Sequence, residues 1–159
     1  MSLPEINTIL YTSSLGKHTR PVFRQAVSMA SLYQAKIIML HVVEPIGETG
    51  QVLIQRYLPK NLIKTVHDEG LQKVKDKMKQ RVQTFYQEEL ERLDGVPEIE
   101  IEHIVGEGHR SDVIVETADK YHADLILIGS HNSFGRSSRT TRQVIKYADR
   151  PVVVVPTRS

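Results

Sequence analysis

The sequence predicts an α/β domain built on a five-stranded parallel sheet of order 3-2-1-4-5, with helices on both faces. Short, nearly continuous apolar runs alternate along the chain with longer segments of helical periodicity. This alternation is typical of parallel strands joined by right-handed helical crossovers. The length of 159 residues suits one domain better than two.

The first strand is expected at residues 6–11, followed by a turn that contains Gly16. Thr19 is a suitable N-cap for the first helix, and Pro21 is tolerated in its first turn. Residues 36–43 are almost continuously apolar, which is typical of a strand covered on both faces. His41 lies within this run and is expected to be a hydrogen-bonded core residue.

The middle of the chain differs in character from the two ends. Residues 46–60 contain Gly and Pro without a firm period and predict a loop or lid. Residues 62–93 carry one apolar stripe on a highly charged helix. Together they predict a variable loop and helix segment at about residues 46–93, inserted in a single domain over residues 1–159.

The second half returns to strand and helix alternation. Residues 98–105 alternate between apolar and polar side chains, which predicts a half-exposed strand at a sheet edge. Ser111 is a candidate cap for the next helix. A buried strand at residues 125–128, a polar loop with a helix after it, and a last strand at residues 151–156 complete the pattern.

Composition excludes several classes of partner. The chain has 21 Lys and Arg against 19 Asp and Glu, so the net charge of +2 gives no strong attraction to nucleic acids or acidic membranes. No apolar run is long enough to cross a bilayer, and no export signal is visible. The absence of cysteine is compatible with a reducing compartment, and we expect a cytoplasmic location.

Four segments resemble the universal stress protein family, in the order in which that family has them: residues 9–16, 36–45, 123–131 and 150–156. The resemblance implies a Rossmann-like, nucleotide-binding-type fold. The family has two branches. One binds ATP through an Asp after the first strand, a backbone contact after the His of the second strand, and a G-x2-G-x9-G-[ST] motif. The other branch lacks this motif and is not known to bind ATP.

Most of the ATP-binding pattern is absent when it is carried across residue by residue. Ser14 stands in place of the Asp, and Asn132 and Ser138 stand where two of the glycines belong. Gly129 matches the first glycine, and Val42 follows His41 as the pattern requires. The resemblance therefore implies a stress-response binding or regulatory module without tight ATP binding, closer to the branch that lacks the motif, and no cofactor is expected.

A degenerate nucleotide pocket is the alternative interpretation. Ligands of open parallel sheets bind beyond the carboxyl ends of the strands, and a helix start with a nearby arginine suits a phosphate. The pocket for ATP or AMP would lie at the carboxyl ends of strands 1, 2 and 4. Its candidate residues are Ser14, Val42, Gly129, Ser130, Arg139 and Thr140.

No catalytic or metal site is expected. The seven histidines lack the spacing of metal-binding motifs, and no nucleophile motif is visible, so the sequence predicts that the protein is not an enzyme. The apolar last strand could be an edge that pairs with a second copy, or a helix or the C-terminal tail could cover it. We expect a homodimer through Val152, Val153, Val154 and Val155; a further protein partner is expected but cannot be named.

Overall fold

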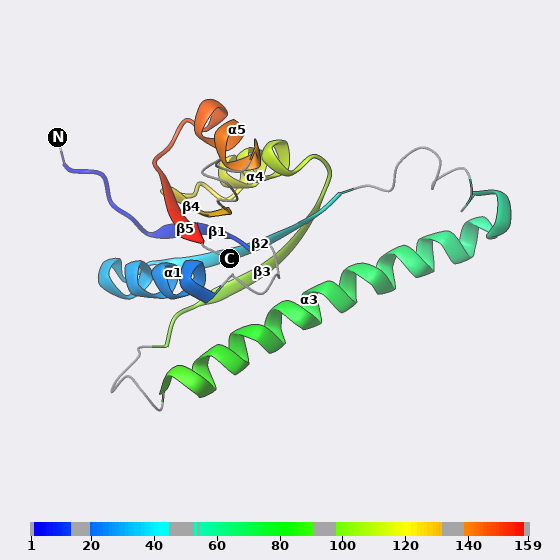
Figure 1. Ribbon diagram of the computed structural model, residues 1–159, viewed down its shortest axis with the longest axis horizontal. Helices are drawn as coiled ribbons and strands as arrows, with labels where there is room; N and C mark the ends of the chain where they lie inside the picture. Colours follow the sequence, from blue (N-terminus) through cyan, green and yellow to red (C-terminus); the bar gives the residue numbers. More distant parts are fainter. Residues whose placement is uncertain are drawn as a thin grey trace. The chain divides into compact units, whose positions relative to one another are not determined.

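The computed structural model describes residues 2–13, 20–44, 53, 55–90, 98–131 and 139–157 (Figure 1). The chain divides into two compact units. One unit joins residues 1–43 to residues 97–159 and contains the sheet, whereas residues 44–96 form the other. The first unit contains the candidate functional site.

The sheet is parallel, and its strands follow the order β3-β2-β1-β4-β5, as the sequence predicts. Because β1 is central and the chain moves outward from it in both directions, the strand order reverses beside β1. The described strands are β1 (Thr8–Thr12), β2 (Lys36–Val43), β3 (Ile101–Glu107), β4 (Leu125–His131) and β5 (Val152–Thr157).

Helices cover both faces of the sheet (Figure 1). Residues with even numbers on the strands, such as Leu10, pack against α4 and α5, whereas the neighbouring Tyr11 contacts the ring of Phe23 on α1 at a centroid distance of 5.5 Å. Successive strand residues point to opposite faces, so one strand can serve two apolar layers. The helices of this unit are α1 (Arg20–Tyr33), α4 (Arg110–Lys120) and α5 (Arg139–Tyr147).

Polar groups hold the amino-terminal edge of the sheet together. The Asp124 carboxylate accepts hydrogen bonds from the backbone N–H groups of Asn7 and Thr8, at 2.7 and 2.9 Å. The Arg150 guanidinium donates to the carbonyl oxygens of Ala118 and Ala123, at 2.7 and 2.6 Å. Asp124 therefore fixes the start of β1, while Arg150 supports the entry into β5.

The unit of residues 44–96 contains the long helix α3 (Lys60–Leu90). The expected loop at residues 46–60 is only partly described, but residues 53 and 55–57 are helical, so the prediction of a loop is wrong there. A helical turn ends before Pro59, which cannot continue it. None of the helices in the described ranges is long and apolar enough to cross a membrane.

The edge strand β3 and the start of α4 test two of the sequence predictions. The strand expected at residues 98–105 is β3, which lies at an edge as expected but runs from Ile101 to Glu107, so residues 98–100 precede it. The cap assigned to Ser111 is wrong, because His109 occupies the N-cap of α4 and no side chain caps that end. The Ser111 hydroxyl instead donates to Oε1 of Gln143 on α5, at 2.9 Å. The physical reason is that the Ser111 hydroxyl is engaged in a contact between α4 and α5. The prediction of a single domain over residues 1–159 stays a prediction.

Candidate functional site

The reversal of strand order places a crevice at the carboxyl ends of β1, β2 and β4. The register aligns Thr12 of β1 with Leu40 of β2, and Tyr11 with Leu127 of β4. Val42 and Gly129 each lie two residues beyond these partners on their own strands. The register therefore brings both residues to the carboxyl-terminal side of the sheet, next to the end of β1.

On the β2 side, one histidine ties the chain that leaves β1 to the neighbouring strand. The Ser13 N–H donates to the Leu40 carbonyl at 2.8 Å, and Nδ1 of His41 lies 2.7 Å from the Ser13 carbonyl oxygen. Since that oxygen can only accept, Nδ1 carries the proton. The expected hydrogen-bonded role of His41 is confirmed, and the side chain is part-buried.

Val42 can offer a ligand only its backbone. Its side chain is 7% exposed and belongs to the apolar cluster beneath α4. Lys36 and Leu40 bond to the β1 side, and alternate residues of a parallel strand face the same neighbour. The peptide group of Val42 therefore faces the space beyond the end of β1, where a backbone contact to a ligand would have to form.

On the β4 side, Gly129 has a packing reason for its missing side chain. A Cβ at this position would lie 2.8 Å from Cγ2 of Val22 on α1 and 3.4 Å from Cγ2 of Thr157. Cβ atoms do not tolerate the first distance, so α1 can pack here only against a glycine. The presence of glycine at 129 is thus explained without a nucleotide.

Two threonines bind the backbone at the end of β4. Oγ1 of Thr141 lies 3.4 Å from the Gly129 carbonyl oxygen, and Oγ1 of Thr157 donates to the Ser130 carbonyl oxygen at 2.8 Å. Ser130 itself is 4% exposed. These bonds bring α5 and β5 to the same end of β4 and leave the Ser130 and Gly129 carbonyl oxygens engaged within the protein.

Arg139 and Thr140 form the start of α5, within two residues of Thr141. Arg139 is exposed and makes no hydrogen bond or ion pair to any described residue, whereas Thr140 is half-buried. A guanidinium at the start of a helix adds to the partial positive charge of its backbone N–H groups. The α5 start is therefore a cationic part of the crevice.

The remaining crevice candidates fall outside what is described. Ser14, Asn132 and Ser138 lie in residues 14–19 and 132–138, so their placement is not part of the structure. Of the six pocket candidates, the structure brings together Gly129, Ser130, Arg139 and Thr140 and places Val42 on the other side of β1. Sequence reasoning missed Thr141, for which the sequence has no local signal.

A histidine and serine at the same edge do not form a hydrolytic site. Oγ of Ser111 donates to Gln143 and lies 3.0 Å from Nδ1 of His109, while Oδ2 of Asp112 lies 3.8 Å from that same Nδ1. A catalytic triad needs the nucleophile and the carboxylate on opposite ring nitrogens. Moreover, Ser111 is 3% exposed, so a substrate cannot reach its hydroxyl.

Within the described ranges, no three His, Asp or Glu side chains are grouped so as to hold a metal ion. The His131 side chain lies outside the described part of the structure, so its distance from His109 stays undefined.

The other candidate site is the strand β5, which lies at the second edge of the sheet. Its four valines are half-buried or, at Val154, 36% exposed. No described strand, helix or tail residue pairs with the outer edge of β5. The expected dimer strand is thus an apolar edge, as the sequence predicts; pairing with a second copy stays a prediction.

The doubly wound parallel sheet, with helices on both faces and a crevice beside β1, defines an α/β fold of the Rossmann-like type. Residues 5–156 match the model of the universal stress protein family. The match spans almost the entire chain, and the protein belongs to this family. No curated protein matches the chain.

Solved structures agree with the fold. The universal stress protein UspA from Lactobacillus plantarum is 21% identical, with a TM-score of 0.66 over 95% of this chain and 98% of that one. A universal stress protein in complex with cAMP is 20% identical, with a TM-score of 0.55 over 96% and 98% of the two chains. The protein from Archaeoglobus fulgidus in complex with dAMP is 18% identical, with a TM-score of 0.53 over 96% and 98%.

Proposed function

We propose that this member of the universal stress protein family acts as a cytoplasmic, dimeric binding module in the stress response, does not bind ATP tightly and catalyses no reaction. The observation that carries the proposal is the edge strand β5, which exposes valines and no charged side chain. An apolar edge of this kind associates with another strand unless something covers it. A second copy of the chain is the simplest partner, because a two-fold axis lets one strand pair with itself.

Three features of the crevice support the proposal that ATP does not bind tightly. Ser14, at the position of the family's Asp, replaces a carboxylate acceptor with a short neutral hydroxyl. The glycine at 129 serves the packing of Val22, so it is no evidence for a nucleotide. Asn132 and Ser138 replace the glycines that allow close backbone approach to phosphates. Among the candidate pocket residues, only Arg139 adds a positive charge that suits a phosphate.

Calorimetric titration with ATP and Mg²⁺ tests this proposal. We expect no binding heat with 1 mM nucleotide, which corresponds to a Kd weaker than about 1 mM. A Kd in the low micromolar range would contradict the proposal. In that case Arg139→Ala should weaken binding, whereas Arg142→Ala, an exposed arginine one turn further along α5, is the matched control.

Binding of a smaller adenine nucleotide is a second candidate function. It is favoured by the exposed guanidinium of Arg139 beside Thr140, which pairs with no described side chain and suits a single phosphate better than a chain of three. Two similar structures hold cAMP and dAMP. Titration with AMP and cAMP under the same conditions decides between the two: micromolar binding that depends on Arg139 and not on Arg142 establishes this function.

The dimer is tested by sedimentation of the purified protein. We expect a mass of twice the 18.1 kDa of the chain at micromolar concentration. A mass of one chain at about 100 µM would contradict the dimer, since a specific interface of standard size should hold at that concentration. Fractionation of cells tests the cytoplasmic location, and a stable membrane or secreted pool would contradict it.

A further inference from the structure

The exposed side of α5 carries a row of positive charge. Its members are Arg139, Arg142 and Lys146, which recur every three or four residues and so share one side of the helix. All three side chains are exposed, and none forms a hydrogen bond or an ion pair with any residue that the structure describes. Thr141 and Val144 mark the buried side of the helix. Since α5 contains no acidic residue, this basic row has no counter-charge on its own helix.

The neighbouring helix α4 carries a row of the opposite sign. Its members are Asp112, Glu116 and Asp119, which have the same kind of spacing and are exposed. Ile114 and Thr117 mark the buried side of α4, opposite this acidic row. Each helix therefore turns a row of charge to solvent, and the two rows differ in sign.

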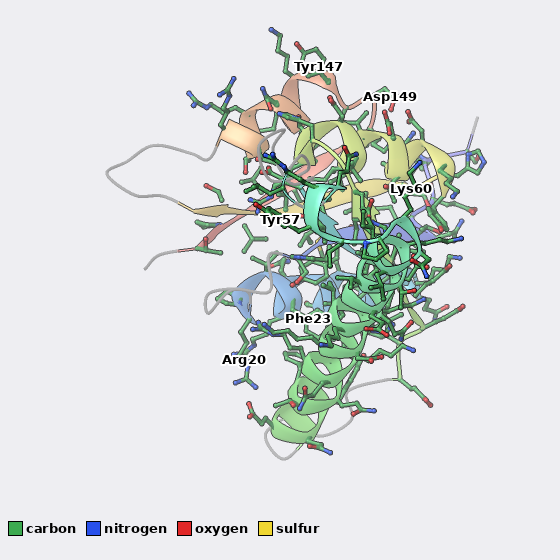
Figure 2. The ribbon with its side chains drawn as sticks, turned by 90° about the vertical axis from the view of Figure 1, so that its right-hand side faces the viewer. Arg20, Phe23, Tyr57, Lys60, Tyr147 and Asp149 are labelled. Carbon is green, nitrogen blue, oxygen red and sulfur yellow. The ribbon has the colours of Figure 1, made fainter. Side chains whose placement is uncertain are left out.

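The two rows lie side by side on one face of the first unit. α4 and α5 pack against each other, and the bond from the Ser111 hydroxyl to Gln143 sets these two residues level. Each helix starts beyond the carboxyl end of one parallel strand and ends before the next strand, so both run in the same direction. Figure 2 shows Tyr147 and Asp149 near the end of α5, and Phe23 of α1 on the opposite face of the sheet.

Such a face can meet a second copy of itself in two ways. Two copies that pack face to face are related by a two-fold axis that lies in the plane of contact. If the axis runs across the helices, α4 lies on α4 of the second copy, and acidic side chains oppose one another. If the axis runs along the helices and between them, α4 of each copy lies on α5 of the other. Only the second arrangement sets each row against its opposite charge.

The positions of the charges along the helices agree with this second arrangement. Rotation about an axis parallel to the helices leaves each residue at its own height. With the level fixed by the contact between the two helices, Asp112 lies about 3 Å along the axis from Arg142 of the second copy. Glu116 and Lys146 each follow four residues later, so their offset is the same. The two-fold axis repeats both pairs.

The remaining members of the rows take no part in this pairing. Asp119 accepts a hydrogen bond from Arg150 at 2.6 Å, and Arg139 lies at the start of α5, about one turn before Arg142. Asp112 keeps its carboxylate available, because its Oδ2 is 3.8 Å from Nδ1 of His109, which is longer than a hydrogen bond.

An exposed aromatic ring lies beside the same axis. Gln143 faces α4, and Tyr147 follows it by one turn on that flank of α5. Tyr147 is 62% exposed, and its ring centre is 5.4 Å from Nζ of Lys146. Because the axis runs between the helices, the Tyr147 rings of the two copies approach each other across it. Tyrosine is enriched at the centres of protein interfaces.

We propose that this face binds the same face of a second copy, with α4 of each copy lying parallel to α5 of the other. Tyr147 lies at the two-fold axis, and the Asp112–Arg142 and Glu116–Lys146 pairs flank it. The contact joins helix faces, uses no strand and is independent of the dimer proposed for β5. Helices of 11 and 9 residues form only a small interface, so the association is weak and salt should disperse it.

Sedimentation equilibrium of the full chain at two salt concentrations tests the association. At a protein concentration of about 200 µM, the mass in about 20 mM NaCl should be at least about twice that in about 300 mM NaCl, because salt screens exposed charges. An equal mass at both salt concentrations would overturn the inference. So would binding of polyglutamate through Arg142 and Lys146 by a protein that does not self-associate, since α5 would then receive an acidic polypeptide.

Charge exchange tests the pairing itself. One variant, Asp112→Lys with Glu116→Lys, makes both helices basic, and a second, Arg142→Glu with Lys146→Glu, makes both acidic. Neither should associate at low salt, because each row would meet its own sign. An equal mixture of the two should associate, and the variant with all four changes should regain association with itself. A mixture that stays at the mass of its components would overturn the arrangement.

The matched control changes charge elsewhere. Lys77→Glu with Lys79→Glu alters the net charge as much as the second variant does, at two exposed positions of α3. It should associate as the unmodified protein does. Loss of association in this control would show that net charge alone is responsible, and the pairing would be wrong. Circular dichroism checks that every variant is folded.

Two substitutions of Tyr147 test the position of the axis. Tyr147→Ala should weaken the low-salt association by about tenfold, whereas Tyr147→Phe keeps the ring and should retain most of the affinity. Equal affinities of the two variants would show that the ring does not lie at the axis, and the proposed geometry would be wrong.

Discussion

The two edges of the sheet are built from strands of similar length but opposite surface chemistry. The β3 edge begins in the segment Glu98 to Glu102, where every second residue is an exposed glutamate. The β5 edge begins at Val152 and presents four valines in a row. Neither edge is paired with a further described strand, so the two terminal strands of the sheet can be compared directly.

The difference predicts that charge disfavours pairing at β3, whereas the apolar edge of β5 favours it. Repeated glutamates on an incoming copy would repel the glutamates of β3, and each would lose hydration on approach. The valines of β5 lose nothing by such an approach and gain from burial. A sheet with one blocked edge and one open edge can form a closed pair without growing into a longer assembly, because each copy has a single site for pairing.

The largest expected effect comes from proline at matched positions on the two edges. Val154→Pro removes an outward donor at β5, and we expect the dimer Kd to rise by about 100-fold through lost hydrogen bonds and ring clash. Val105 is the counterpart on β3, since Glu100 and Gly108 bond toward β2 and odd-numbered residues face outward. Val105→Pro should leave the Kd unchanged.

Sedimentation equilibrium measures both constants, and circular dichroism checks that each fold is intact. If both prolines weaken the dimer equally, or if Val105→Pro alone does so, the predicted difference between the two edges is wrong.

The internal support of β5 gives the next largest effect. Arg150 is 17% exposed and serves two carbonyl oxygens together with the Asp119 carboxylate, at 2.6 Å. Arg150→Ala leaves these acceptors without their donor, which should lower the free energy of unfolding by about 2 kcal/mol. Lysine cannot form the same forked contact, so Arg150→Lys should recover only part of the loss.

Chemical denaturation of Arg150→Ala and Arg150→Lys measures these losses. Unfolding that is unchanged in both would show that the entry into β5 does not depend on the guanidinium, and that the strand is held by its apolar contacts alone.

Close packing behind β3 should show a somewhat smaller effect. A Cβ on Gly106 would lie 2.5 Å from Cγ1 of Val113 on α4. Gly106→Ala should therefore cost about 1–2 kcal/mol of stability through overpacking. Val113→Ala makes room for the new methyl group, so the double variant should be less destabilised than the sum of the two single variants. Strictly additive losses in denaturant titration would contradict this contact.

The smallest effect concerns the glutamates themselves. The double variant Glu100→Val with Glu102→Val removes the charges from the exposed positions of the β3 edge. We expect weak association beyond the dimer at about 100 µM or more, equivalent to less than about 1 kcal/mol per contact at first approach. Light scattering detects it, and Glu100→Asp with Glu102→Asp is the charge-retaining control. A double valine variant that stays dimeric at millimolar concentration would show that charge does not block β3.

Much of the sheet could be predicted because its signals are local. Residues 36–43 are apolar from end to end and became β2 with those same bounds, and the alternation after Glu98 correctly placed β3 at an edge. A helix start next to Thr19, with Pro21 in the first turn, was also expected, and α1 begins at Arg20; the cap itself, Thr19, lies outside the described residues. In each case a few neighbouring residues contain the whole pattern.

The site could be predicted only in part, because its contacts join residues that are distant in sequence. Ser111 looks like a helix cap until Gln143, 32 residues further along, is seen to accept its hydroxyl. Likewise, Gly129 looks like a ligand-binding glycine until Val22 of α1 is found against it. No local pattern reveals such partners.

The bond between Asp124 and the Thr8 N–H, which spans 116 positions, has a consequence for folding. Pairing β1 with β4 closes a very long loop, and the unit of residues 44–96 accounts for a large share of it. The entropy of loop closure grows only with the logarithm of length, so that unit adds roughly 0.5 kcal/mol to the barrier. A long helix can therefore be inserted between β2 and β3 while slowing the assembly of the sheet only about twofold.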